Sequence, residues 1–176
     1  MNTESPNSMA DQTQPQQNNM DCPPPVLVLG VGNILLSDEA AGIRVIEALQ
    51  KLPLPEGVEV VDGATRAMEL MDIIRGRKKV IIVDAVAAES EPGAVFRFGP
   101  GQLAEIKQMS ISVHDIGVHE AIFFLRMTDE LPEDIVFYGI QPGSLALHEG
   151  LTPEVNAAVK KVIDFVLEDL KNLPDS

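Results

Sequence analysis

Residues 26–50 read VLVLGVGNILLSDEAAGIRVIEALQ, and this stretch decides the fold. Val26 to Leu29 is a short apolar run that ends at Gly30, which indicates a buried strand. The part from Glu39 to Gln50 has the spacing of an amphipathic helix, with its apolar positions at Ile43, Val45, Ile46 and Leu49. A strand that leads through a glycine turn into a helix predicts the first unit of an α/β fold.

The same alternation continues along the rest of the chain. Apolar runs bounded by turn residues predict further strands at Val58 to Val61, Val80 to Val83 and Ile135 to Ile140, with an edge strand at Val95 to Phe98. Amphipathic patterns predict helices at Ala67 to Arg75, Gly117 to Met127 and Pro153 to Leu170. We therefore expect a single-domain α/β fold, with a mostly parallel twisted sheet of about five strands and helices on both faces.

The composition of the chain changes at Pro25. Residues 1–25 are rich in Asn, Gln and Pro and contain no Lys or Arg, so they lack the apolar surface that a packed segment needs. We predict a disordered tail over residues 1–25 and a folded domain over residues 26–176. The only cysteine, Cys22, lies in this tail, which excludes an intramolecular disulfide and fits a reducing cytoplasm.

The chain is strongly acidic. Its 27 Asp and Glu residues against 13 Lys and Arg give a formal net charge of −14 at pH 7. Nucleic acid and anionic membranes are therefore poor partners, because affinity for phosphates rests on basic side chains. No apolar run reaches the ~20 residues of a membrane helix, and the first residues lack the pattern of a secretion signal. We expect a cytoplasmic monomer.

Ligands of doubly wound sheets bind outside the carboxyl ends of the strands, and three polar residues fall at such positions. Glu39 follows the first strand, Asp84 ends the third, and His114 lies in a loop before a helix. Each has a plainer interpretation. Ser37 could cap a helix whose first turn holds Asp38 and Glu39, Asp84 could form a turn, and His114 could be a surface residue.

Two carboxylates and one imidazole from three separate connections also suit an open catalytic metal site, which keeps positions for water or substrate. Mixed oxygen and nitrogen ligands do not select among zinc, nickel and other first-row ions. A weak alternative is a dinucleotide site, because Gly30 and Gly32 begin the glycine pattern of such sites. Leu35 stands where the third glycine belongs, and the acidic residues before the helix would repel a phosphate.

Several segments occur in an order that resembles the hydrogenase maturation endopeptidases. The first, Val28 to Gly42, is the most specific, and the others are Val60 to Thr65, Ile82 to Ala85, Ser112 to Gly117, Gly139 to Pro142 and Gly150 to Val155. Ala64 and Ala67 depart from the glycines that are frequent in the second motif. The resemblance covers Val26 to about Leu170.

The resemblance implies a cytoplasmic endopeptidase that removes the C-terminal extension of the nickel-iron hydrogenase large-subunit precursor after nickel insertion. It implies that Glu39, Asp84 and His114 are metal ligands and that Asp38 is a catalytic candidate. The second motif, Gly63, Ala64 and Thr65, is expected to bind the substrate backbone. A non-catalytic checkpoint or scaffold module for the same precursor is the alternative.

The sequence favours hydrolysis by water, because it has no serine-nucleophile elbow and Cys22 lies in the tail. Two mechanisms stay open, and they correspond to a metal-dependent and an aspartyl-type endopeptidase. Either a metal held by the three ligands activates water, or the ligands dock on the precursor's own nickel while Asp38 helps to activate water. We expect nickel supplied by the precursor, with zinc or another divalent ion as the alternative in the isolated protein.

Overall fold

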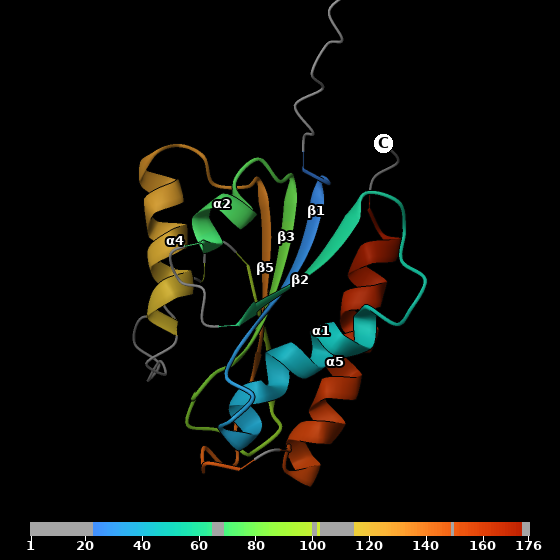
Figure 1. The fold of residues 1–176 in the computed structure, drawn as a ribbon, viewed down its shortest axis with the longest axis vertical. Coiled ribbons are helices and arrows are strands. Elements are labelled where there is room, and N and C mark those ends of the chain that lie inside the picture. Colours follow the sequence, from blue (N-terminus) through green and yellow to red (C-terminus); the bar gives the residue numbers. More distant parts are fainter. Residues whose placement is uncertain (1–22, 65–68, 100–101, 103–114, 149, 174–176) are drawn as a thin grey trace, which may run out of the picture.

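The computed structural model describes residues 23–64, 69–99, 102, 115–148 and 150–173. The predicted tail thus lies almost wholly outside the described residues and stays a prediction. The described part forms one twisted sheet with helices on both faces (Figure 1). The predicted fold class is confirmed. Within the described residues, no helix is long and apolar enough to cross a membrane.

The sheet has five strands in the order β2-β1-β3-β5-β4. Four of them run parallel, and β4 pairs with β5 in the antiparallel sense at the edge. The edge position predicted for Val95 to Phe98 is therefore confirmed. The strands are β1 (Val26–Val31), β2 (Val58–Ala64), β3 (Lys79–Ala85), β4 (Val95–Phe98) and β5 (Asp134–Ile140).

The helices form two layers. One layer combines α1 and α5, and the other combines α2 and α4 (Figure 1). The first predicted helix begins earlier than expected, as a short 3-10 helix, η1, that leads into α1. The bounds are η1 (Ser37–Ala40), α1 (Ala41–Leu49), α2 (Leu70–Ile74), α4 (Asp115–Met127) and α5 (Pro153–Lys171).

The central strands are buried on both faces, as their uninterrupted apolar runs predict. In β1, Val26 and Val28 belong to the core under α1 and α5, whereas Leu27 and Leu29 belong to the core under α2 and α4. Full burial of such a side chain contributes about 1.5–3 kcal/mol. Both cores together fix the sheet, and the loops at the strand ends are placed on this rigid frame.

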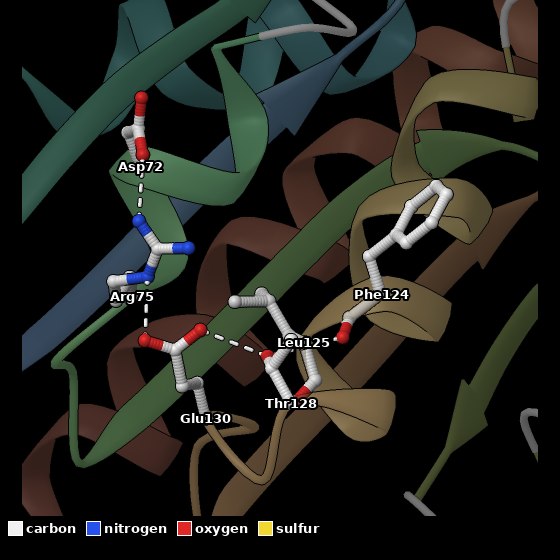
Figure 2. A network of polar contacts seen from close by, with 6 residues as sticks. All are labelled: Asp72, Arg75, Phe124, Leu125, Thr128 and Glu130. Atoms are coloured by element: carbon white, nitrogen blue, oxygen red, sulfur yellow. Dashed lines mark hydrogen bonds and ion pairs between the residues drawn. The ribbon is translucent and has the colours of Figure 1, made fainter.

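Side-chain contacts connect the end of α2 with the turn after α4. Arg75 binds Asp72 and Glu130, with nitrogen–oxygen distances of 2.9 Å in each pair. The hydroxyl oxygen of Thr128 lies 2.8 Å from a carboxylate oxygen of Glu130 and 3.1 Å from the carbonyl oxygen of Phe124, so its single proton is shared between two acceptors. Figure 2 shows how this network joins the end of α2 to the turn after α4.

The direction in which successive strands are added to the sheet reverses at β1, because β2 pairs on one side of it and β3 on the other. Such a switch point opens a crevice at the carboxyl ends of the two central strands. Gly42 packs directly against the ends of both strands, since a Cβ at that position would overlap the carbonyl oxygens of Val31 and Val83. A second glycine, Gly30, lets Ile46 of α1 approach the sheet closely. The start of α1 therefore lies against β1 and β3.

Candidate functional site

The carboxyl ends of β1 and β3 carry the acidic residues that the sequence singles out. η1 packs against β3, so the helix that contains Glu39 lies beside the strand that contains Asp84. Both residues are 3% exposed. The structure thus brings two of the three predicted ligands to the same crevice.

The backbone between β1 and η1 folds back on itself and fixes Glu39. The amide of Asn33 donates to the carbonyl of Glu39 at 3.3 Å, and the amide of Glu39 donates to the carbonyl of Leu36 at 3.0 Å. Gly32 has a φ of 144°, and a Cβ there would overlap the Glu39 carbonyl. Only glycine combines this backbone conformation with so close an approach.

Asp84 is the second-last residue of β3 and pairs with Gly139 of β5. Its Oδ1 accepts a hydrogen bond from the amide of Ala85 at 2.7 Å. This bond is to the next residue of the strand, whereas the turn interpretation predicts a bond to the backbone two residues on, so that interpretation stays a prediction. The bond holds the carboxylate at the point where the chain leaves the sheet.

Asp38 is fully buried and holds a distant loop. Its Oδ2 accepts hydrogen bonds from the amides of Gly143 at 2.8 Å and Ser144 at 2.9 Å, and from the hydroxyl of Thr152 at 2.9 Å. Its Oδ1 accepts the amide of Thr152 at 2.7 Å. Four donors on one carboxylate form a strong, charge-assisted clasp. The clasp joins η1 to the segment between β5 and α5, which we call the closing loop (residues 141–152).

Thr152 contacts Asp38, and the sequence analysis did not single it out. It occupies the N-cap position of α5 but makes no side-chain capping bond there, because its hydroxyl donates to Asp38 instead. The carboxylate of Asp38 thereby lies near the start of α5, where the helix dipole favours a negative charge. A threonine followed by Pro153 marks the helix start in the sequence, but nothing there shows its partner.

Ser37 does not have the capping role considered for it. Its hydroxyl donates to the carbonyl of Gly150 at 3.0 Å, and no side-chain bond caps η1. Its φ is 44°, a left-handed conformation that is rare for residues other than glycine. Non-glycine residues in this region cluster at functional sites. Ser37 is therefore a second attachment of the closing loop to η1, just before the two acids.

Gln141, also missed by the sequence analysis, orders the loop after β3. Its Oε1 accepts the amides of Ala88 at 2.7 Å and Ser90 at 3.3 Å, and its Nε2 donates to the carbonyl of Pro142 at 3.2 Å. The only sequence signal for this role is that Gln141 is a polar residue directly after an apolar strand. Gln141 thus links the loop after Asp84 to the closing loop.

The remaining predicted site residues are described only in part. His114 and Thr65 lie outside the described residues, and the side chain of Ala64 is not described. Gly63 is buried, and a Cβ there would come within 3.0 Å of the Gly30 carbonyl. Its small size serves close packing of β2 on β1. Among the described residues, no group of three or more His, Cys, Asp or Glu side chains gathers as a metal site. The ligand set with His114 and the substrate-binding motif stay predictions.

The site defines a class of protein before any comparison. Carboxylates at the start of the first helix take the place where a dinucleotide-binding fold receives a phosphate. The protein is thus an α/β protein with an acidic switch-point site rather than a nucleotide-binding one.

Comparison with known proteins gives the particular family. A sequence profile described as hydrogenase maturation protease matches residues 43–169. The hydrogenase 2 maturation protease of Escherichia coli strain K12 is 40% identical over 148 residues, which cover 83% of this chain and 90% of that protein. A hydrogenase expression/formation protein of Thiocapsa roseopersicina is 31% identical over 84% of this chain and 68% of its own length. The chain belongs to the hydrogenase maturation protease family.

Solved structures agree with this assignment. The hydrogenase maturating endopeptidase HybD from E. coli superimposes with a TM-score of 0.78 at 39% identity, covering 83% of this chain and 91% of that one. The NiFe hydrogenase maturation protease HybD from Thermococcus kodakarensis gives a TM-score of 0.70 at 26% identity, covering 82% and 98%. The fold around the crevice is therefore that of known maturation proteases.

Proposed function

We propose that this protein is an endopeptidase that removes the C-terminal extension of a nickel-iron hydrogenase large-subunit precursor after nickel insertion. The observation that carries the proposal is the pair of buried carboxylates, Glu39 and Asp84, at the β1–β3 crevice of a chain from the maturation protease family. The relatives named as proteases and endopeptidases support hydrolysis of a peptide bond. Action in the cytoplasm, as a monomer, is part of the proposal.

Glu39 and Asp84, together with the predicted ligand His114, would bind the nickel that the precursor carries. Carboxylate oxygens and an imidazole form a ligand set that first-row divalent ions accept. Nickel bound at such a site would polarise the scissile carbonyl or lower the pKa of a nearby water. Zinc or another divalent ion in the isolated protein is the competing version of the same proposal.

The protein's own part in this proposal is to position groups. The fixed turn from Gly32 to Glu39 and the end of β3 hold the two carboxylates without the freedom of long loops. Preorganised polar groups need no rearrangement as the reaction proceeds. The water-activating role predicted for Asp38 stays a prediction, and its four accepted hydrogen bonds favour a holding role.

The experiment is a cleavage assay on two forms of the precursor, one empty and one loaded with nickel, followed by mass spectrometry. The metal content of the purified protein is measured beforehand. We expect loss of the C-terminal peptide only from the loaded precursor, even when zinc is supplied with the empty form. Prompt and correct cleavage of the empty precursor by a zinc-loaded protein would point to a conventional metallopeptidase. Binding without cleavage would point to the checkpoint or scaffold alternative.

A further inference from the structure

A group of exposed apolar side chains lies next to the acidic crevice. Ile34 and Leu35, which follow β1, are 46% and 52% exposed, and Leu145 and Leu147 of the closing loop are 49% and 82% exposed. We call these four side chains the apolar rim. Phe124 and Met127 on α4 form a comparable exposed apolar pair away from the crevice.

The two halves of the apolar rim come from segments far apart in the sequence, and main-chain contacts join them. Leu36 and His148 form an isolated parallel β-bridge. The amide of His148 donates to the carbonyl of Leu35 at 3.1 Å, and the amide of Ser37 donates to the carbonyl of His148 at 2.8 Å. Figure 1 shows the start of the first helix and the segment between β5 and α5 at the same end of the molecule.

The Asp38 clasp fixes this pairing. The amide of Asp38 donates to the carbonyl of Ser144 at 3.1 Å, and its carboxylate accepts the amides of Gly143, Ser144 and Thr152. Ordering a loop costs conformational entropy, and here a buried charge holds in place leucines that are themselves exposed. Rigid apolar side chains at the surface lower the entropy cost of binding a partner.

The stretches on which the four rim side chains lie, residues 30–37 and 141–147, contain no charged residue, and Asp38 and Glu149 are the next acids along the chain. Residues 30–37 read GVGNILLS and residues 141–147 read QPGSLAL, in a chain with 27 acidic and 13 basic residues. Depletion of charge combined with large apolar side chains is typical of the centre of a protein interface. An uncharged apolar segment is the chemistry that this surface fits.

We propose that the apolar rim docks an uncharged apolar segment of the large-subunit precursor beside the bond to be cleaved, and that Asp38 is a positioning residue that sets the geometry of the rim. This inference rests on the proposed function. The position of the rim favours a precursor segment as the bound partner, because only Leu36, Ser37 and Asp38 separate the rim from Glu39 of the proposed cleavage site. A segment bound at the rim is therefore held against the crevice, as cleavage at a defined bond requires.

The test uses the double variant Leu145→Ser/Leu147→Ser, with Phe124→Ser/Met127→Ser as the matched control. Both pairs replace two exposed apolar side chains by serine, and unfolding midpoints are measured to show that both variants fold. Nickel-loaded precursor, labelled at its C-terminus, is mixed with excess enzyme in single-turnover reactions. We expect the rim variant to raise the half-saturating enzyme concentration at least about tenfold and to keep the saturated rate within about twofold. The control should keep both values near those of the parent.

An unchanged half-saturating concentration, or an equal rise in the α4 control, overturns the docking proposal. If the parent protein cleaves no precursor at all, the proposed function fails separately. Affinity for the nickel-loaded precursor is then measured by titration, and equal affinity of parent and rim variant overturns the docking proposal as well. Sedimentation of the parent alone tests a second copy as occupant. A dimer that the rim variant disperses would assign the rim to self-association and sink the proposal.

Discussion

Two aspartates attach α5 to the rest of the molecule, one at each end, and they do so by different chemistry. Asp38 holds the start of α5 from a position that is 0% exposed, and its four donors are three main-chain amides and a hydroxyl. Asp169 holds the end of α5 with a side chain that is 19% exposed. Its partners are the hydroxyl of Tyr138 at 2.7 Å and the guanidinium of Arg97 at 3.2 Å.

The difference between the Asp38 and Asp169 contacts separates two regions: the crevice beside Glu39, and the edge of the molecule where α5 meets β4. Side-chain pairs such as Arg97 and Asp169 join a helix to an edge strand and leave part of both groups in water. The Asp38 clasp uses a buried charge to fix loops that have no core of their own, and those loops lie beside Glu39. A fully buried carboxylate is costly unless every oxygen is satisfied. Substitutions at the crevice should therefore cost more than substitutions at the periphery.

The largest effect is expected for the carboxylates of the crevice. Glu39→Gln or Asp84→Asn should lower the rate of precursor processing at least about 100-fold, because an amide is a poorer metal ligand and cannot carry the charge. The circular dichroism spectrum should stay near that of the parent, since both changes keep the side-chain shape. Processing is measured by loss of the C-terminal peptide.

The matched control for the crevice carboxylates is Glu47→Gln, which removes an acid from the exposed side of α1 where it pairs with Arg44. It should process precursor at the parental rate. If Glu39→Gln or Asp84→Asn does the same, that residue has only a turn or packing role, and the contrast between crevice and periphery is lost.

Asp38→Asn should be the most damaging of these changes for stability. An asparagine turns one of its two terminal groups into a donor, which then faces groups that are donors themselves. The expected loss is roughly 2–4 kcal/mol in the free energy of unfolding, measured by urea denaturation. Asp164→Asn, an exposed change on α5 with the same loss of charge, serves as control. Equal stability of the two variants would contradict the clasp.

Thr152 gives a graded version of that test. Thr152→Val removes the hydroxyl donor and keeps the amide donor, so it should cost about 1 kcal/mol. Thr152→Ser keeps both donors and should remain close to the parent. The same urea titrations measure this order, and a Thr152→Val variant as stable as Thr152→Ser would show that the hydroxyl contributes nothing to the clasp.

The buried phenol of Tyr138, which contacts Asp169 at the far end of α5, is a group whose titration can be followed directly. Burial, and then the hydrogen bond to Asp169, raise the pKa of Tyr138 from 10.0 to about 12. The neutral phenol therefore stabilises the fold fully below pH 10, and this contribution is lost as the pH rises towards 12. Because Tyr138 is the only tyrosine, phenolate absorbance measures its pKa in the folded protein.

Tyr138→Phe completes this comparison, since it removes the titrating group and keeps the ring. The stability advantage of the parent over this variant should shrink between pH 10 and 12, measured by urea titrations at several pH values. Asp169→Asn should move the phenolate titration to lower pH, because the aspartate helps to keep the phenol protonated. A tyrosine that titrates at its ordinary pKa would show that this end of α5 is looser than described.

The sequence predicted the sheet well and the clasp not at all, and the reason is physical. β1 and β3 are apolar on both faces, so their runs mark them directly. Asp84 is singled out because it ends the apolar run of β3, and Glu39 because it lies on the connection that follows β1. Three of the four donors to Asp38 are backbone amides that lie 105, 106 and 114 residues away along the chain. Every residue type but proline carries such an amide, so no sequence pattern marks these donors.

The smallest effect is expected for the network in Figure 2, which joins exposed groups of α2 and the turn after α4. Arg75 has a side chain that is 43% exposed, and exposed ion pairs contribute little because water and salt screen them. Arg75→Gln should lower the melting temperature by less than about 2 °C, and the difference from the parent should fall as salt is added. Lys160→Gln on α5 is the control for removing one positive charge from this acidic chain.

The same network has a pH dependence. The hydroxyl of Thr128 and then Arg75 lower the pKa of Glu130. The contribution of this carboxylate is therefore present above its unfolded pKa of about 4.5 and is lost as the pH falls through the lower, folded value. A salt-independent loss for Arg75→Gln as large as that of Asp38→Asn would contradict the division between a rigidly held crevice and a screened periphery.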